Sequence, residues 1–152
     1  MDQTEYGQPP RTGWAKLVPE LYVSDFDVSL EHWCRAFGFS IAYQRPAERF
    51  AYLERPEGCQ IMLCQWDADW NGAPIERPCG RGVLLQVFVD DVGKITQAIE
   101  AQGGSIQSGP REVWRRWGDR EGGKREIFAQ DPDGFLVLFA QDIGERPLPP
   151  NA

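Results

Sequence analysis

Residues that could carry out chemistry are sparse in this sequence. It contains one histidine, His32, and four cysteines (Cys34, Cys59, Cys64 and Cys79), and no two cysteines have the C-x-x-C spacing of zinc or redox sites. No G-x-S-x-G motif, phosphate-binding glycine loop or Ser-His-Asp order can be assembled. The sequence therefore predicts reduced, partly buried thiols, a histidine that lies on the surface or packs on a helix, and no metal or cofactor.

Polar side chains on otherwise apolar strands are better candidates for a binding site. Because successive side chains of a strand alternate between the two faces of a sheet, four segments separate into an apolar face and a mixed face. The apolar face, which should pack under helices, comprises Leu21, Val23, Ile61, Leu63, Leu85, Val87, Val89, Val137 and Phe139. On the mixed face, the expected ligand-binding residues are Glu20, Tyr22, Gln60, Met62, Leu84, Gln86, Phe88 and Leu138.

The polar members of the mixed face predict a hydrated groove, because an unpaired buried carboxylate or amide costs about 1–3 kcal/mol. Such a groove, apolar with a few polar anchors, is typical of a small-molecule site. The alternative is that a partner subunit fills the groove, or that it closes around Met62 and Leu138.

Two tryptophans, Trp114 and Trp117, lie in the charged, glycine-rich stretch REVWRRWGDREGG, which we interpret as an exposed, loop-like hairpin. Exposing an indole ring to water is unfavourable. We therefore expect both rings to contact either a ligand in the groove or a partner subunit. Trp66 and Trp70 lie in the connecting region and are expected to cover sheet edges.

An internal repeat positions these residues. The segments LYVSDF (21–26) and VFVDDV (87–92) each read as a strand that ends at a helix start. A shift of 66 residues superimposes them and places the helix-terminating Gly38 on Gly104. Ser24 with Asp27 resembles a capping box at the first helix.

Each expected helix has one apolar stripe, followed by three strand-like runs. The stripes are Phe26, Leu30, Trp33 and Phe37 in the first half and Val92, Ile95 and Ile99 in the second. The runs are FSIAYQR, RFAYLER and QIMLCQW, then SIQ with REVW, KREIFAQ and FLVLFA. The pattern predicts an α+β fold of two βαβββ repeats.

The expected domain covers residues 16–142. Its first repeat spans residues 16–66, a turn-rich linker spans 67–81 and the second repeat spans 82–142. The proline-rich ends, 1–15 and 143–152, are expected to be tails.

Motifs at both ends of this region resemble a known superfamily. The pattern V-S-D-F (23–26) before a helix and F-G-F (37–39) after it is similar to the opening of vicinal-oxygen-chelate proteins, the glyoxalase, bleomycin-resistance and extradiol dioxygenase superfamily. The string KREIFAQDPDGFLVLFAQ (124–141) resembles their closing hairpin, with D-P-D-G at the turn. The resemblance implies two curved mixed sheets around a cleft.

The resemblance also implies where metal-dependent members hold their ligands. These positions are occupied here by Val18, Met62, Leu84 and Leu138. Aliphatic side chains have no lone pair for zinc, nickel or iron, and a thioether suits these ions poorly. The chain therefore resembles the metal-free bleomycin-resistance branch, whose members bind a drug in a cleft at a dimer interface.

Composition narrows the choice of partners. The net charge is −7 and there is no basic stripe, so we expect no nucleic acid. No window approaches the roughly 18 apolar residues of a membrane helix, and the N-terminus is acidic and proline-rich, so we expect a cytoplasmic protein without a membrane partner.

The favoured interpretation is a homodimeric, metal-independent binding protein. It would sequester a cationic or aromatic compound, and the resemblance implies bleomycin-type antibiotics and hence antibiotic resistance. One alternative is a small lyase or isomerase on the same fold with Glu20 as general base. A second alternative is a non-catalytic interaction module whose groove is vestigial.

Overall fold

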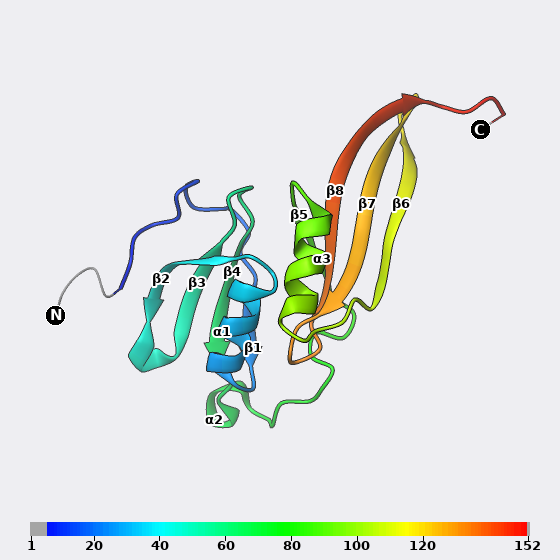
Figure 1. Ribbon diagram of the computed structural model, residues 1–152. Helices are drawn as coiled ribbons and strands as arrows, with labels where there is room; N and C mark the ends of the chain where they lie inside the picture. The colour runs from blue at the N-terminus through cyan, green and yellow to red at the C-terminus, as the bar shows by residue number, and fades with distance from the viewer. Residues whose placement is uncertain (1–5, 152) are drawn as a thin grey trace.

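The computed structural model describes residues 6–151, which form two modules of similar topology (Figure 1). The first module contains β1 (Glu20–Val23), α1 (Phe26–Arg35), β2 (Ser40–Arg45), β3 (Phe50–Glu54) and β4 (Gln60–Gln65). Its sheet has the order β1-β4-β3-β2, in which β1 is parallel to β4 and the other neighbours are antiparallel.

The second module repeats this arrangement. It contains β5 (Leu84–Phe88), α3 (Val92–Ala101), β6 (Ser108–Trp117), β7 (Arg120–Gln130) and β8 (Leu136–Pro147). The strand order is β5-β8-β7-β6, again with one parallel pair, β5 and β8. A short helix, α2 (Ala68–Asn71), lies in the connection between the modules. The α+β fold of two βαβββ repeats predicted from the sequence is confirmed.

The helices follow the 66-residue repeat in both their first and last residues. Each begins after an aspartate cap: Asp25 accepts a hydrogen bond from the Val28 backbone, and Asp91 accepts one from the Lys94 backbone. The expected capping box of Ser24 with Asp27 is therefore wrong. Serine and aspartate are equally good caps, and here the Ser24 side chain makes a contact with the second module instead.

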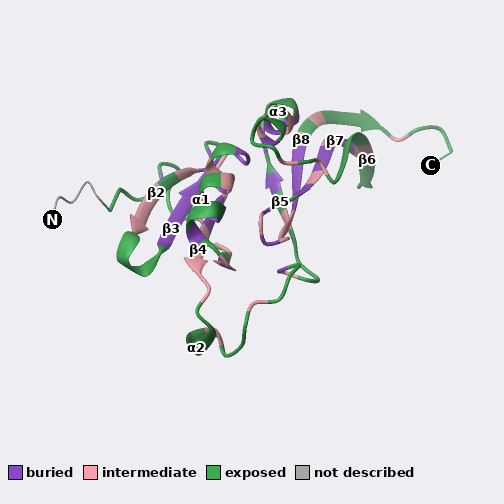
Figure 2. Cartoon of the chain, turned by 60° about the horizontal axis from the view of Figure 1, so that its bottom comes forward, coloured by how far each residue is buried: buried purple, intermediate pink, exposed green. Residues whose placement is uncertain are grey.

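The apolar faces of both sheets pack against the helices and merge into one core. The predicted core residues of β1, β4, β5 and β8 are buried, apart from Leu85, which packs at the core margin. The Phe37 and Phe139 ring centroids are 5.0 Å apart, so the core is continuous from one module to the other. Figure 2 shows the buried positions gathered in the inner strands and the exposed positions along α2 and the distal part of β8.

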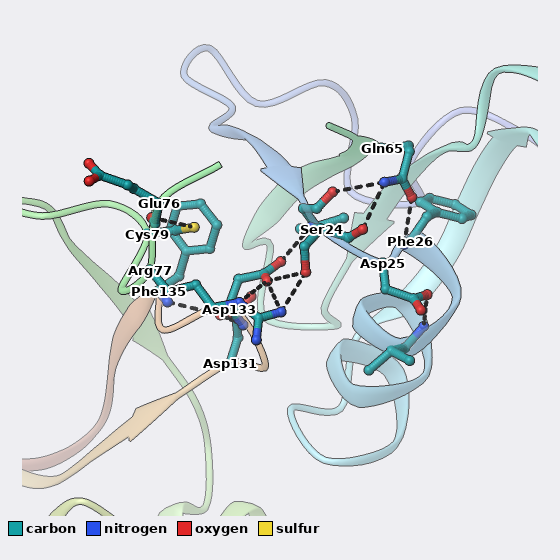
Figure 3. Close-up of polar contacts among 12 residues, drawn as sticks. Ser24, Asp25, Phe26, Gln65, Glu76, Arg77, Cys79, Asp131, Asp133 and Phe135 are labelled. Atoms are coloured by element: carbon teal, nitrogen blue, oxygen red, sulfur yellow. Dashed lines mark hydrogen bonds and ion pairs between the residues drawn. The ribbon is translucent and has the colours of Figure 1, made fainter. Parts of the chain in front are cut away.

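Polar contacts join the modules next to this core (Figure 3). The backbone nitrogen and hydroxyl of Ser24 both donate to the Asp133 carboxylate, at 2.8 and 2.5 Å. Arg77 of the linker also pairs with Asp133, at 2.9 Å. The Trp33 indole nitrogen donates to Asp131, at 3.1 Å. The D-P-D-G turn of the second module thus contacts Ser24, the residue before the α1 cap, and Trp33 on the core face of α1.

The stretch around Trp114 and Trp117 is a long hairpin of β6 and β7, and the expectation of a loop-like segment is wrong. Its glycines make room for indole rings: a Cβ at Gly122 would lie 3.0 Å from Trp117, and one at Gly123 would lie 2.7 Å from Trp114. The glycines that indicated a loop therefore occupy strand positions where a larger residue would clash. Strand β8 likewise continues to Pro147, past the expected domain end at Asp142.

Residues 6–15, expected as a tail, lie along the first sheet. The Trp14 ring packs edge-on against Tyr52, with centroids 5.3 Å apart. Arg11 pairs with Glu54 at 3.0 Å. The Gln60 side chain accepts a hydrogen bond from the backbone nitrogen of residue 15 and donates one to the carbonyl of residue 13. This segment covers part of the sheet face opposite α1.

Candidate functional site

A pocket of about 730 Å³ opens on the helix-free face of the first sheet. Glu20 and Tyr22 contribute from β1, and Cys64 contributes from β4, which pairs with β1 in parallel register. These residues alternate with Leu21, Val23 and Leu63 of the core, as the period-two pattern of the sequence predicts. Strand alternation therefore supplies one wall of the pocket.

Tryptophans from the connection between the modules line the pocket beside Tyr22. Trp66 follows β4 directly, and its indole nitrogen donates to the Ala73 carbonyl at 2.9 Å, which fixes the ring. Helix α2 presents Trp70, whose ring centroid is 5.2 Å from that of Tyr22. The Tyr22 and Trp66 centroids are 6.2 Å apart and nearly perpendicular. The sequence reasoning missed both tryptophans as site residues.

Glu20 differs from the other charged groups around the pocket in having no protein partner among residues 6–151. The two arginines are engaged elsewhere, since Arg45 pairs with Glu48 at 2.6 Å and Arg49 pairs with Asp27 at 3.2 Å. Asp67 accepts backbone hydrogen bonds as the cap of α2. Within residues 6–151, the Glu20 carboxylate has no hydrogen bond or ion pair. It therefore offers an uncompensated negative charge to whatever enters the pocket.

The groups beside Glu20 stay protonated near neutral pH. Burial and the charge of Glu20 raise the pKa of Tyr22 above its ordinary value. Burial, again with Glu20, raises the pKa of the Cys64 thiol. A phenol and a thiol that remain neutral can donate hydrogen bonds but are poor nucleophiles. The chemistry of the pocket is therefore that of a carboxylate in an aromatic surround.

A smaller hollow of about 310 Å³ continues from this pocket towards the linker. It shares Glu20, Tyr22 and Trp66 with the larger pocket and ends against Phe135 of the closing turn. A ligand longer than a single ring system could extend along this path.

The helix-free face of the second sheet has its own pocket, of about 490 Å³. Four predicted ligand-binding residues line it: Leu84, Gln86, Trp117 and Leu138. Six of the ten predicted ligand-binding residues thus line two separate pockets, one on each module.

The remaining predicted site residues lie elsewhere. Trp114 and Trp117 are three residues apart in β6 and so face opposite sides of the sheet; Trp114 packs under Arg146, 4.0 Å from the ring centroid. The amide of Gln60 is used by the N-terminal segment and by the Tyr52 hydroxyl. Met62 is half-buried in β4, and Phe88 is exposed at the end of β5.

Comparison with protein families identifies the chain. The family model of the Glyoxalase/Bleomycin resistance protein/Dioxygenase superfamily matches residues 13–139. The chain belongs to this superfamily. A curated protein similar to it is a putative lactoylglutathione lyase from Brassica oleracea var. gemmifera, 25% identical over 130 residues. The match covers 84% of this chain but only 44% of that protein, so the chain spans less than half the length of this relative.

Solved structures show the same fold. A protein of unknown function from Agrobacterium tumefaciens str. C58 has a TM-score of 0.63 and 20% identity, over 85% of this chain and 94% of that one. TioX from Micromonospora sp. ML1 has a TM-score of 0.61 and 25% identity, over 86% of this chain and 100% of that one. Virulence protein STM3117 from Salmonella typhimurium has a TM-score of 0.59 and 22% identity, over 84% and 98%.

The metal chemistry of some superfamily members does not fit the residues of this chain. Val18 lies just before β1, Met62 is in β4, Leu84 begins β5 and Leu138 is in β8, and none of the four has an oxygen or nitrogen donor in its side chain. Among the described residues, no group of three or more histidine, cysteine, aspartate or glutamate side chains could hold a metal ion. In the same part of the chain, no helix is long and apolar enough to cross a membrane.

Proposed function

We propose that this superfamily member is a metal-independent binding protein for an aromatic organic cation. The observation that carries the proposal is the Glu20 carboxylate, without a protein partner in residues 6–151, in a pocket walled by Tyr22, Trp66 and Trp70. A carboxylate and the faces of aromatic rings together attract a cation, because the carboxylate is negatively charged and the ring face has a negative electrostatic potential. Bleomycin-type compounds, which the family resemblance suggests, belong to this chemical class.

The strength of such a site depends on how far it excludes water. A charge-assisted hydrogen bond contributes about 1.5–3 kcal/mol, and a cation–π contact adds about 0.5–2 kcal/mol. The pocket is open on one side in the single chain, so a second wall would strengthen both contacts by lowering the local dielectric constant.

We propose that the second wall comes from another copy of the chain. The second sheet exposes apolar side chains on its helix-free face: Leu84 is 45% exposed, Phe88 49% and Trp117 53%. Exposed groups of this kind mark interaction surfaces. Facing the first sheet of a partner, they would cover its pocket and form a cleft at a dimer interface.

Matched ring compounds test the proposed specificity. Calorimetry should compare 2-naphthylmethylammonium with the neutral 2-naphthylmethanol, and bleomycin belongs in the same panel. We expect the cation to bind at least about tenfold more tightly, the equivalent of 1.4 kcal/mol. Equal affinities would show that the Glu20 charge does not select the ligand.

A variant pair locates the binding site. Trp70→Leu removes one wall of the pocket, whereas Trp14→Leu removes another exposed indole ring that does not line it. We expect only Trp70→Leu to weaken binding of the naphthyl cation. Equal losses in both variants would place binding outside this pocket.

A second candidate function is metal-free proton transfer with Glu20 as general base. The similarity to a putative lactoylglutathione lyase favours testing it. A lactoylglutathione-forming activity that persists with chelator and is lost in Glu20→Gln would support this function. If the unaltered protein has no such activity, only the binding function remains.

A further inference from the structure

The helix-free face of the second sheet contains a carboxylate that has no access to solvent. Glu126 of β7 has a side chain 0% exposed, yet it lies on the pocket face and not in the core. Arg115 contacts it at two points, with Nη1 2.6 Å from Oε1 and Nη2 3.3 Å from Oε2. Arg111 approaches it as well, at 3.7 Å. Two guanidinium groups thus share one carboxylate, and a positive charge remains in excess.

The burial of Glu126 fixes the orientation of Arg115. Burying a carboxylate is costly unless it is paired and hydrogen-bonded. The two-point contact satisfies this requirement and holds the guanidinium in one plane. Guanidinium has five N–H donors, and Glu126 accepts from only part of them. The Arg115 side chain is 55% exposed and lines the pocket, so its other donors are available to a ligand.

The surroundings of Arg115 suit an aromatic anion. Trp117 follows Arg115 by two residues in β6, so the exposed indole lies on the same face, one strand step away. Lys124 and Arg116 are further cations that line the pocket. The Lys124 ammonium is 3.2 Å from the exposed Asp142, and Arg116 donates to the carbonyl of residue 118 at 3.2 Å. The Gln86 amide faces the same space from β5, and leucine side chains form an apolar wall.

We propose that this pocket is a binding site for an aromatic carboxylate, whose anionic group pairs with Arg115 while its ring contacts Trp117. Glu126 is a positioning residue that holds Arg115 ready. Carboxylates and guanidinium groups match in geometry, which is why arginine is suited to bind them bidentately.

This site has the opposite charge preference from the pocket on the first sheet and goes beyond the function proposed for that pocket. All of its residues come from the second module of one chain. It therefore stands whether or not Glu20 binds a cation, and in the proposed dimer Leu84 and Trp117 of this pocket would also line the cleft between the two chains.

The test uses 2-naphthoate as probe, with calorimetry on the full chain. Arg115→Lys keeps the charge and the pairing with Glu126 but loses the bidentate geometry, and we expect it to weaken 2-naphthoate binding about five- to tenfold. Glu126→Gln keeps Arg115 but loosens its orientation, and we expect a smaller loss. The control is Arg125→Gln: Arg125 neighbours Glu126 in β7 on the opposite face and pairs with Glu112 at 3.0 Å.

Arg125→Gln should leave 2-naphthoate binding within about twofold. Equal losses in Arg115→Lys and Arg125→Gln would overturn the proposal, as would failure of millimolar 2-naphthoate to bind the unaltered protein. Circular dichroism confirms that each variant is folded, and a loss of 2-naphthoate affinity in a folded Arg115→Lys protein supports the site. Glu20→Gln, which tests the first pocket, should not change 2-naphthoate affinity, so the two proposals can fail separately.

Discussion

Ser24 and Asp133 are 109 residues apart in the chain, and the Ser24 hydroxyl lies 2.5 Å from the Asp133 carboxylate. The Ser24 backbone nitrogen donates to the same carboxylate at 2.8 Å. The contact joins the residue before the α1 cap to the closing turn of the second module. This contact is one of several that join the two modules, together with the Trp33–Asp131 hydrogen bond and the packing of Phe37 on Phe139.

Removing the Ser24 hydroxyl should weaken the contact between the two modules. We expect Ser24→Ala to lower the free energy of unfolding by about 1–2 kcal/mol, because a charge-assisted hydrogen bond to a fully buried carboxylate is lost. Urea unfolding measures the difference. Ser105→Ala, at an exposed position, is the control and should change stability by less than about 0.5 kcal/mol. A Ser24→Ala protein as stable as the control would mean that the hydrogen bond from the Ser24 hydroxyl to Asp133 contributes nothing to the free energy of unfolding.

Asp131 predicts a pH dependence of stability. Burial raises the pKa of Asp131 from 3.8 to about 6, against the hydrogen bonds from Trp33 and two backbone nitrogens that lower it. Between pH 4 and 6 the unfolded chain loses this proton before the folded protein does. The contribution of protonated Asp131 to the free energy of unfolding is therefore fully present below about pH 4 and is lost as the pH rises to about 6.

The measurement compares unfolding free energies of the unaltered protein and Asp131→Asn across this range. Because asparagine does not titrate, the stability of the unaltered protein relative to the variant should fall by about 2–3 kcal/mol as the pH rises from 4 to 6. Asp142→Asn is the control, since the Gly144 backbone and Lys124 lower the pKa of Asp142. Here the stability of the unaltered protein relative to the variant should rise with pH, and at lower pH than for Asp131. A constant difference for Asp131→Asn would contradict the prediction.

The residues at the positions where the family resemblance implies metal ligands predict the metal content of the protein. We expect purified protein to contain no stoichiometric transition metal, because Val18, Met62, Leu84 and Leu138 provide no oxygen or nitrogen donor. Elemental analysis of untagged protein prepared without chelator is the measurement. One tightly bound zinc, nickel, manganese or iron ion per chain would show that other residues form a site.

The exposed apolar side chains of the second sheet predict a dimer. Light scattering at micromolar concentration should report about twice the chain mass of 17.2 kDa. Phe88→Glu places a charge in the proposed interface and should shift the mass towards one chain, whereas Val28→Glu, an exposed change on α1, should not. A monomeric unaltered protein would leave each pocket open to solvent.

Local patterns predicted most of the fold. Alternation identified the buried faces of β1, β4, β5 and β8, because alternation depends on neighbours within a few residues. The 66-residue repeat placed both helices, because each half of the chain has the same order of elements. The cap of α1 was misplaced by one residue, since Ser24 and Asp25 are both good caps and only the contact with Asp133 distinguishes them. The hairpin of β6 and β7 was expected, but its strands were predicted too short because the glycines at its end also fit a loop.

The candidate site was predicted only in part. Glu20 and Tyr22 followed from strand alternation, which is a local property. Trp66 and Trp70 reach the same pocket because the connection after β4 places α2 beside Tyr22 of β1. That path has no periodicity in the sequence; the only signal was the four-residue spacing of two tryptophans around a capping aspartate, Asp67.

The most direct test of the central claim is to measure two quantities on Glu20→Gln, its affinity for 2-naphthylmethylammonium and its melting temperature. The substitution keeps the shape of the side chain and removes its charge. Glu20 is exposed and has no partner in residues 6–151, so the melting temperature should be unchanged or raised. The affinity should fall about ten- to a hundredfold, which corresponds to the loss of about 1.5–3 kcal/mol. Unchanged affinity with a lower melting temperature would contradict the account and make Glu20 part of the scaffold.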